Sequence, residues 1–464
     1  MSTSRAGITI AVIVCSQFLN AFTGSALNVS IPTIGADFAA AAADLGWLVT
    51  TYNMCTVALL LPLGRLADLT NRRAMFITGL AVLAVVAEVS AWVPTLGGLI
   101  ATRVVQGVGA SCLFATGQAI LVSAVDPKQR GRAIGLTVAA VYVGLSVGPV
   151  IGGLITHHLG WRSVFHLIAV LGLVNGAFAV WRLPQSEQRR PANLLAELDV
   201  PGIALVVGAA LALTYGLTTL PSPPGIAFTA AGVALLGVFV WVERRAAQPL
   251  ISPALWAGGP NFALSNLSAL LSYAATFAVS YLLAIHLQQV QGLTADLAGF
   301  VLITSPAVQA LLSPWAGRAA DRHSPFIMAS AGMGLCAVGL IVFATISAQT
   351  PLVLIIANLA LIGAGFGLFA SPNTTAVMSM ARPSEYGIAN AFLSMMRNLG
   401  MVVSMAIITI TVTQFFGRTA IADASPELIT ATLRFCFAVF AGICILGVFT
   451  SLRRSGATSI PEPK

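Results

Sequence analysis

Three charged side chains stand inside long apolar stretches of this 464-residue sequence. A charge in such a stretch costs free energy in a membrane and usually has a function. Arg103 lies about six residues into one stretch, Arg397 lies near the middle of another, and Glu88 lies close to the end of a third. An arginine at the centre of a bilayer costs roughly 2.5–3.5 kcal/mol unless it faces a partner or water. Such groups can bind protons or contact a substrate, or they can reach the membrane surface when they are shallow.

The pattern G-R-x-A-D occurs twice, at 64–68 and 317–321, each time in a short polar gap between apolar stretches. A carboxylate in such a gap can pair with arginines or approach a helix N-terminus. Such a bond would hold one conformation and break in another, whereas the alternative is an ordinary positively charged loop. The residues of this expected conformational latch are Gly64, Asp68, Arg72, Arg73, Asp321 and Arg322.

Glycines recur every fourth residue at Gly144, Gly148 and Gly152, so they share one face of a helix. A face without side chains lets another helix approach closely in lipid. Pro149 removes one backbone hydrogen bond and favours a kink, and Gly153 directly follows Gly152. These five residues predict a hinge, and ordinary close packing in the membrane is the alternative.

The composition indicates which elements position these residues. The chain is 57% hydrophobic and 8% charged, whereas a soluble domain has roughly 25% charged residues. Because a helix of about 20 apolar residues crosses the hydrocarbon core, we expect an all-α membrane protein with about fourteen spans. The expected spans are 8–33, 46–63, 75–92, 98–122, 134–156, 164–181, 201–219, 226–242, 263–287, 298–316, 326–346, 351–370, 388–412 and 431–451.

The basic residues predict the orientation of the spans. If the N-terminus is cytoplasmic, 18 of the 23 basic residues fall in cytoplasmic segments, and only Arg162, Arg418 and Arg434 fall in outer ones. This asymmetry favours an even number of spans and a multi-pass protein of the inner (plasma) membrane with both termini in the cytoplasm.

The repeat predicts the domain organisation. The two G-R-x-A-D patterns are 253 residues apart, and a second match, 131–144 against 387–400, has an offset of 256. Two six-helix halves separated by an inserted helix pair give such offsets. We expect a first six-helix bundle at 1–183, a linker and two inserted helices at 184–260, a second bundle at 261–452 and a cytoplasmic tail at 453–464.

Segments 64–73, 99–110 and 144–153 resemble, in this order, motifs A, B and C of the drug:proton antiporters of the major facilitator superfamily. The start of the second span at Trp47, the triplet Ser371-Pro372-Asn373 and the R-N-x-G pattern at 397–400 are similar to the fourteen-helix subgroup. The resemblance implies the major facilitator fold. It further implies that Arg103 takes part in proton coupling, that Arg397 contacts substrate, and that the fifth span bends as a hinge.

One position departs from the resembled subgroup. Thr23 stands where these exporters typically carry an aspartate that is thought to bind protons or cationic drugs. Glu88 is then the acidic residue left inside a span; it could pair with Arg103 and serve coupling, or it could be an interfacial carboxylate. Asp296, at the outer start of the tenth span, is a further coupling candidate. With two intramembrane arginines, an anionic or neutral substrate becomes more plausible than for a typical drug pump.

Polar and aromatic side chains of the spans are expected to line the substrate cavity. These are Asn20, Thr23, Gln106, Gln118, Tyr273, Tyr281, Gln309, Asn358, Arg397 and Asn398. The sequence shows no metal-ligand spacing, no nucleotide-binding loop and no catalytic cluster, so we expect no metal, no cofactor and no enzymatic activity. The expected partners are a small-molecule substrate, protons and membrane lipid, not nucleic acid, and the chain is expected to be a monomer.

Two functions remain open from the sequence. The first is proton-coupled export of amphipathic drugs or metabolites by alternating access between two bundles. The second is transport of organic anions or metabolites by the same fold with atypical or no proton coupling, which the threonine at position 23 favours.

Overall fold

A computed structural model describes residues 3–40, 42–184, 197–246, 248–253, 255, 260–416 and 425–453. Within these residues, fourteen helices are long and apolar enough to cross a membrane, which confirms the expected number. The helices are α1 (Thr3–Phe38), α2 (Ala42–Leu45), α3 (Trp47–Leu69), α4 (Arg72–Trp92), α5 (Leu96–Ala124), α6 (Arg130–Leu159), α7 (Arg162–Arg182), α9 (Val200–Thr219), α10 (Pro223–Glu243), α12 (Asn261–Thr276), α13 (Val279–Ile285), α14 (Ala295–Leu302), α15 (Thr304–Ala320), α16 (Pro325–Phe343), α17 (Leu352–Met380), α18 (Tyr386–Phe416) and α19 (Pro426–Leu452). Short segments are η1 (Pro127–Gln129), the π-helical η2 (His286–Val290) and η3 (Pro383–Glu385). Residues 185–196 of the expected linker, and the expected tail beyond Arg453, lie outside the described residues.

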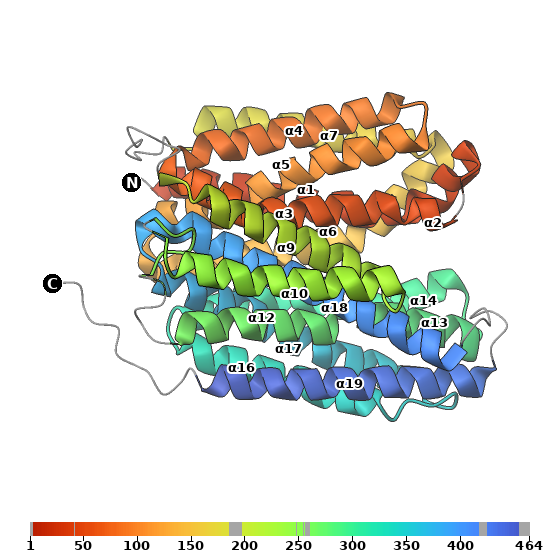
Figure 1. Ribbon diagram of the computed structural model, residues 1–464. Coiled ribbons are helices and arrows are strands. Elements are labelled where there is room, and N and C mark those ends of the chain that lie inside the picture. The colour runs from red at the N-terminus through yellow and green to blue at the C-terminus, as the bar shows by residue number, and fades with distance from the viewer. Residues whose placement is uncertain are drawn as a thin grey trace.

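The helices form two groups, one above the other in Figure 1. Helices α1 and α3 to α7 pack against one another, and we call them the first bundle. Helices α12 to α19 form the second bundle. Because the chain reverses after every crossing, α1 begins at the same end of the molecule at which α19 ends. We call this the terminal end, where Leu69 and Ala124 lie, and the opposite end the distal end, where Phe38 and Trp92 lie.

Helices α9 and α10 form a separate pair that covers one seam between the bundles. In Figure 1 the pair lies in front of the junction, and α9 contacts both α3 of the first bundle and α18 of the second. Trp47 of α3 stacks on Tyr215 of α9, with ring centroids 5.9 Å apart. At another seam, α6 packs directly against α15. The inserted pair therefore makes the molecule asymmetric about its two halves.

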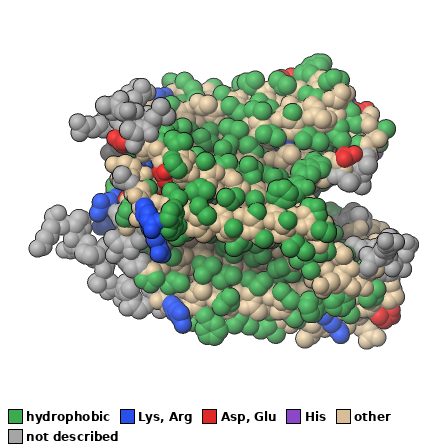
Figure 2. Space-filling view, in the orientation of Figure 1, with side chains coloured by type: hydrophobic (Ala, Val, Ile, Leu, Met, Phe, Trp, Pro, Cys, Tyr) green, Lys and Arg blue, Asp and Glu red, His purple; other side chains and the backbone are tan. Residues whose placement is uncertain are grey.

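Side-chain caps keep the reversals between helices short. Asn71 Oδ1 accepts a hydrogen bond from the N–H of Ala74 at the start of α4 (2.9 Å), and Thr95 Oγ1 accepts one from Gly98 at the start of α5 (3.2 Å). Such caps satisfy N–H groups that have no partner inside the helix. Figure 2 shows an outer surface rich in apolar side chains between the two ends, as contact with hydrocarbon requires. Short capped turns thus hold the ends of long, lipid-facing helices in fixed positions.

Candidate transport site and its latches

Asp68, in the last turn of α3, joins the two bundles at the terminal end. Its carboxylate accepts hydrogen bonds from the backbone N–H groups of Gly387 (2.9 Å) and Ile388 (2.8 Å) in the first turn of α18. A helix N-terminus has free N–H groups and a partial positive charge, so it stabilises a carboxylate. Asp68 also forms a buried ion pair with Arg72 (2.6 Å), and Arg72 donates to the carbonyl of Pro383 in the second bundle (2.6 Å). We call this contact the Asp68 latch.

Asp321, directly after α15, makes the matching contact in the opposite direction. Its carboxylate accepts hydrogen bonds from the N–H groups of Gly131 (2.6 Å) and Arg132 (3.0 Å) in the first turn of α6. Partial burial raises the pKa of Asp321 above its ordinary value, although the two N–H donors act in the opposite sense. We call this contact the Asp321 latch, and it ties the second bundle to the first just as Asp68 ties the first to the second.

Glycines allow the backbones to approach at both latches. A Cβ atom on Gly64 would lie 2.5 Å from the Cβ of Ala391 and 3.0 Å from the carbonyl oxygen of Gly387. A Cβ atom on Gly317 would overlap the carbonyl oxygen of Gly131. Only a hydrogen atom fits at these positions, which explains why the repeated motif begins with glycine.

Two residues of the expected latch bind elsewhere or face solvent. Arg73 donates to the carbonyl of Val180 on α7 (2.5 Å), so its contact stays within the first bundle. Arg322 is exposed. Of the charged residues expected in the latch, Asp68, Arg72 and Asp321 therefore make the hydrogen bonds across the seam.

The glycine face of α6 packs on α1. A Cβ atom on Gly144 would lie 2.6 Å from the carbonyl oxygen of Phe18, and one on Gly152 would lie 2.8 Å from the Cα of Ala26. A Cβ atom on Gly148 would overlap the hydroxyl of Ser25, which itself donates to the carbonyl of Gly144 (3.1 Å). The close packing that the glycine spacing predicts is therefore present; the hinge motion stays a prediction.

Two other residues of the expected hinge lie off this face. A Cβ atom on Gly153 would meet only Val29, at an ordinary 3.5 Å, and Pro149 is exposed on the surface of α6. Helix α6 continues through Pro149 to Leu159. Gly153 therefore adds little to the contact with α1.

Arg103 is 1% exposed and lies inside the first bundle, so it does not reach the membrane surface. Its Nε donates to the carbonyl of Leu48 (3.0 Å), and its Nη1 donates to Oε1 of Gln106 (2.6 Å). The guanidinium lies over the ring of Tyr52, 4.4 Å from the centroid, and the Tyr52 hydroxyl donates to Oδ1 of Asn20 (2.9 Å). Three helices thus meet around this cation, which the described residues surround with neutral oxygens and a ring but no carboxylate.

Glu88 does not pair with Arg103. Its carboxylate lies 2.9 Å from Nδ1 of His166 and accepts a hydrogen bond from the indole of Trp92 (2.9 Å), and its side chain is 47% exposed. The two side chains do not meet because they lie on different faces of their helices. Glu88 points from α4 toward α7 and the surface, whereas Arg103 points from α5 toward α3. Asp296 is the second residue of α14, but its side chain lies outside the described part of the chain.

A cluster of aromatic rings surrounds Arg397 at mid-depth of the membrane. Arg397 is half-buried and lies eleven residues after Tyr386, so it is about 17 Å from the start of α18. It donates to the hydroxyl of Thr374, and its guanidinium carbon lies 5.8 Å from the ring centroid of Tyr273. Phe366 packs edge-on against Tyr273, with centroids 5.0 Å apart.

Tyr142 brings the first bundle to this cluster. Its ring packs edge-on against Phe366, with centroids 5.9 Å apart, and its hydroxyl interacts with that of Tyr273. Of these residues, only Arg397 and Tyr273 were expected from the sequence to line the cavity. Phe366 and Tyr142 were missed because an aromatic residue in an apolar span looks like ordinary packing, and only the tertiary arrangement reveals the cluster.

Most of the other residues expected in the cavity make local or intrabundle contacts. Gln118 donates to Thr137, Asn358 to the carbonyl of Gly339, Gln309 to Ser305, Asn398 to the carbonyl of Ser394, and Thr23 to the carbonyl of Leu19. Tyr281 is 44% exposed. Gln106 and Asn20 belong to the Arg103 cluster instead.

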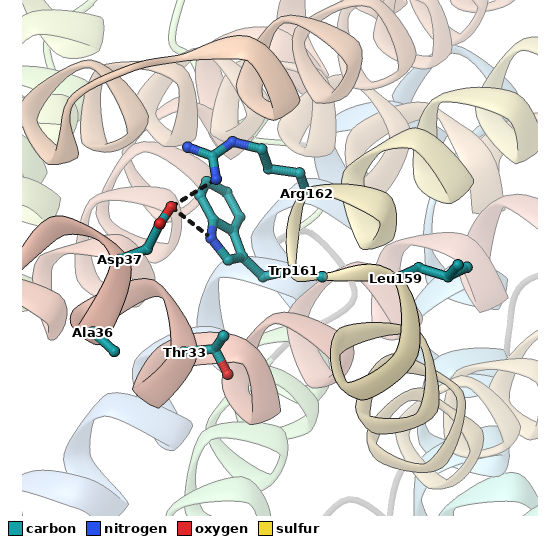
Figure 3. A pocket seen from close by; sticks show the side chains of 7 residues that line it. Thr33, Ala36, Asp37, Leu159, Trp161 and Arg162 are labelled. Carbon is teal, nitrogen blue, oxygen red and sulfur yellow. Dashed lines mark hydrogen bonds and ion pairs between the residues drawn. The ribbon is translucent and has the colours of Figure 1, made fainter.

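An open depression of about 530 Å³ lies at the distal end of the first bundle (Figure 3). Asp37, near the end of α1, faces Arg162 and Trp161 at the start of α7, and it accepts hydrogen bonds from them (2.6 and 3.2 Å). These bonds lower the pKa of Asp37 below its ordinary value, with the Arg162 bond the larger cause. Both partners belong to one bundle, so this ion pair does not join the two halves.

Most of the hydrogen bonds that described residues form between the bundles lie toward the terminal end, and the hydroxyls of Tyr142 and Tyr273 meet at mid-depth. Besides the two latches, the amide of Asn390 on α18 donates to the carbonyl of Phe114 on α5. At the distal end the outline of the molecule in Figure 2 is notched between the bundles. Hydrogen bonds therefore tie the two bundles together at the terminal end.

Comparison with known proteins agrees with this architecture. The Major Facilitator Superfamily description matches residues 13–243 and 266–463. The riboflavin transporter RibZ of Clostridioides difficile is 30% identical over 405 residues, which are 86% of each chain. The multidrug resistance protein Stp of Mycobacterium tuberculosis is 28% identical over 392 residues, which are 82% of this chain and 71% of Stp. The crystal structure of the human organic anion transporter MFSD10 superimposes with a TM-score of 0.68 at 13% identity, covering 96% of this chain and 99% of that one.

Fourteen helices that are long enough to cross a membrane, arranged as two bundles with an inserted helix pair, define a membrane transporter. The chain belongs to the Major Facilitator Superfamily, and its relatives include multidrug efflux proteins in keeping with the fourteen-helix drug:proton antiporter subgroup.

Proposed function

We propose that this transporter exports an amphipathic drug or metabolite from the cytoplasm in exchange for protons, by alternating access of the two bundles. The observation that carries the proposal is the pair of latches, in which each bundle places a carboxylate on a helix N-terminus of the other. Such bonds are made and broken at an exposed end without unfolding either bundle. The names of the relatives, a riboflavin transporter and a multidrug resistance protein, support a small organic substrate.

We further place the terminal end in the cytoplasm and the protein in the inner (plasma) membrane as a monomer. The sequence supports this orientation, since 18 of its 23 basic residues fall in segments that are cytoplasmic if the N-terminus is cytoplasmic. In this orientation the structure is outward-facing: the cytoplasmic end is latched and the distal end faces outside. The two bundles then correspond to 1–183 and 261–452, with 184–260 between them.

Within this proposal, Arg103 is the coupling residue of the first bundle. Among the described residues its fully buried charge is held by neutral groups, so a change in the charge or hydration around it would alter its contacts strongly. Glu88 is exposed and paired with His166, which supports an interfacial role more than a central one.

Flux measurements in proteoliposomes test the proposal. Riboflavin and the cation ethidium serve as probe substrates, and a pH-sensitive dye reports proton movement. We expect the solute and the protons to cross the membrane in opposite directions. The solute flux should fall at least several-fold when the pH gradient is collapsed. Glu88→Gln should retain most of the flux, whereas Arg103→Gln should lose it. Equal flux with and without the gradient would contradict proton-coupled exchange.

A second function, transport of organic anions without proton coupling, is favoured by one specific observation. Thr23 is fully buried and donates only to its own helix, so α1 has no carboxylate at the position expected to bind protons or cations. Flux of an anionic probe that is indifferent to the pH gradient would support this function over the first.

A further inference from the structure

We propose that Arg397, Tyr142, Tyr273 and Phe366 form a binding site for a substrate that carries a flat aromatic ring and an anionic group such as a carboxylate. The inference rests on the proposed transport function and assigns the chemical class of its substrate. The juxtaposition that carries it is a half-buried arginine without an acidic partner beside three rings contributed by both bundles.

Arg397 uses only part of its hydrogen-bonding capacity within the protein. Its Nη2 donates to the hydroxyl of Thr374, and its Nε is buried without a hydrogen-bond partner. In the described part of the chain the ion pairs belong to Asp68, Asp37 and Glu88, and none of these pairs includes Arg397. A guanidinium presents a planar fork of donors that suits a carboxylate. A ligand carboxylate would give the free donor a partner and neutralise a charge at mid-membrane.

Arg103 shows what a satisfied intramembrane arginine looks like in the same molecule. Arg103 is 1% exposed, uses both Nε and Nη1, and sits 4.4 Å from the Tyr52 centroid. Arg397 is half-buried, its Nε is free, and its aromatic neighbour is 5.8 Å away. The first guanidinium is enclosed by its own bundle, whereas the second is half-buried near the seam and keeps one donor unpaired.

The rings beside Arg397 offer edges and faces with which a flat aromatic ligand could pair. Phe366 is edge-on to both Tyr142 and Tyr273, with centroid separations of 5.9 and 5.0 Å. Aromatic rings pair well in offset or edge-to-face geometry, so another ring can take its place among them. The two tyrosine hydroxyls add polar groups at the same depth.

The site spans the seam, which links binding to transport. Tyr142 belongs to α6 of the first bundle, whereas Arg397, Tyr273 and Phe366 belong to the second. A ligand held between them contacts both moving bodies, so its affinity must differ between conformations that separate Tyr142 from Phe366. Differential affinity of this kind is the requirement for a ligand to shift a conformational equilibrium.

Binding of three matched naphthalene probes to the purified full-length protein in nanodiscs tests the site. The probes are 2-naphthoate, neutral 2-naphthamide and the cation 2-naphthyltrimethylammonium, measured by calorimetry at neutral pH without any gradient. We expect 2-naphthoate to bind at least tenfold more tightly than the amide, and the cation to bind most weakly. Equal affinities for the three probes, or tighter binding of the cation, would overturn the proposal.

Substitutions of Arg397 test whether this side chain causes the preference for the anionic probe. Arg397→Gln should reduce 2-naphthoate affinity at least tenfold and leave 2-naphthamide nearly unchanged, whereas Arg397→Lys should retain part of the preference for the anion. Arg434→Gln is the matched control, because Arg434 donates to the carbonyl of Ile346 at the distal end of the same bundle. If Arg397→Gln lost equal affinity for the anion and the amide, Arg397 would not recognise the charge of the ligand. The wild-type comparison decides the matter even if Arg397→Gln fails to fold.

This outcome is separable from that of the proposed function. If 2-naphthoate binds with the expected preference but is not exchanged for protons in proteoliposomes, the site stands and the coupled export fails. If a pH gradient drives flux of riboflavin or ethidium while 2-naphthoate does not bind, the transport function stands and the site assignment fails.

Discussion

The Asp68 and Asp321 latches share one sequence pattern but bury very different amounts of charge. Both place a carboxylate on two N–H groups of a helix in the other bundle. At the first latch the side chains of Asp68 and Arg72 are 1% and 7% exposed, and Arg72 reaches across the seam. At the second, Pro325 occupies the position that corresponds to Arg72, and Asp321 is only partly buried. The repeat thus preserves the backbone contact, and the arginine clamp strengthens one side alone.

Of the variants that test this difference between the latches, we expect Asp68→Asn to destabilise the latched state most. It leaves Arg72 buried without its ionic partner, and breaking a buried pair in this way costs about 3–5 kcal/mol. The latched state should lose that much relative to the unlatched one, a shift of about a hundredfold or more. Faster hydrogen exchange of the Gly387 and Ile388 amides, together with reduced export, checks the expectation.

Asp126→Asn is the matched control for this variant. Asp126 lies at the same end but accepts a hydrogen bond only from Lys128, two residues away. Exchange at 387–388 should not change in the control. Unaltered exchange in Asp68→Asn would show that the carboxylate does not hold the seam.

Gly64→Val and Gly317→Val should have nearly equal effects, because the glycine contact is the part that both latches share. A side chain at either position meets backbone of the other bundle, and overpacking of this kind costs about 1–3 kcal/mol. Each variant should slow export by roughly ten- to a hundredfold. Gly334→Val provides the control, since a Cβ atom there meets nothing within 4 Å. A large loss in one latch variant and none in the other would break the proposed equivalence of the two backbones.

The features that follow from short-range pattern were predictable from the sequence. The fourteen spans follow from apolar length, and the contacts of the two aspartates across the seam follow from a repeated pentapeptide, whereas their role in a conformational change stays a prediction. The close face of α6 follows from glycines spaced by four, because helical geometry places them together without knowledge of the partner helix. Gly153 was expected in the hinge and not on that face, and it lies one residue beyond the repeat and thus about 100° around the helix.

The partners of individual side chains were not predictable, because they depend on how helices rotate against each other. Glu88 and Arg103 lie at similar depth on neighbouring helices, which suggested a pair. The rotation of α4 directs Glu88 to His166, 78 residues along the chain, and α5 directs Arg103 to Leu48 and Gln106. The position of Tyr142 was unpredictable for the same reason. Its local sequence does not distinguish a ring at the seam between the bundles from a ring in the core of one bundle.

Asp321→Asn should have a smaller effect than Asp68→Asn. The asparagine keeps one acceptor oxygen, no arginine is stranded, and partial burial already disfavours the ionised form of Asp321. A carboxylate at a helix N-terminus contributes about 1 kcal/mol, so the latched population should fall about fivefold. Hydrogen exchange of the Gly131 and Arg132 amides measures the change. If Asp321→Asn matched Asp68→Asn in effect, the asymmetry between the latches would be absent in solution.

Asp37→Asn should have the smallest effect, and it distinguishes an ion pair inside one bundle from a latch between two. Arg162 and Trp161 lower the pKa of Asp37, so their contribution to stability is present above the ordinary aspartate pKa, about 3.9, and is lost as the pH falls through the lowered value. The variant should therefore melt slightly below the wild type by the same margin from pH 5 to pH 8, and the margin should shrink below about pH 4. Export should stay unchanged at neutral pH, because α1 and α7 move together. A change in export, or a melting difference that persists at the lowest pH, would mean that this distal pair takes part in the conformational change and that the latches at the terminal end do not act alone.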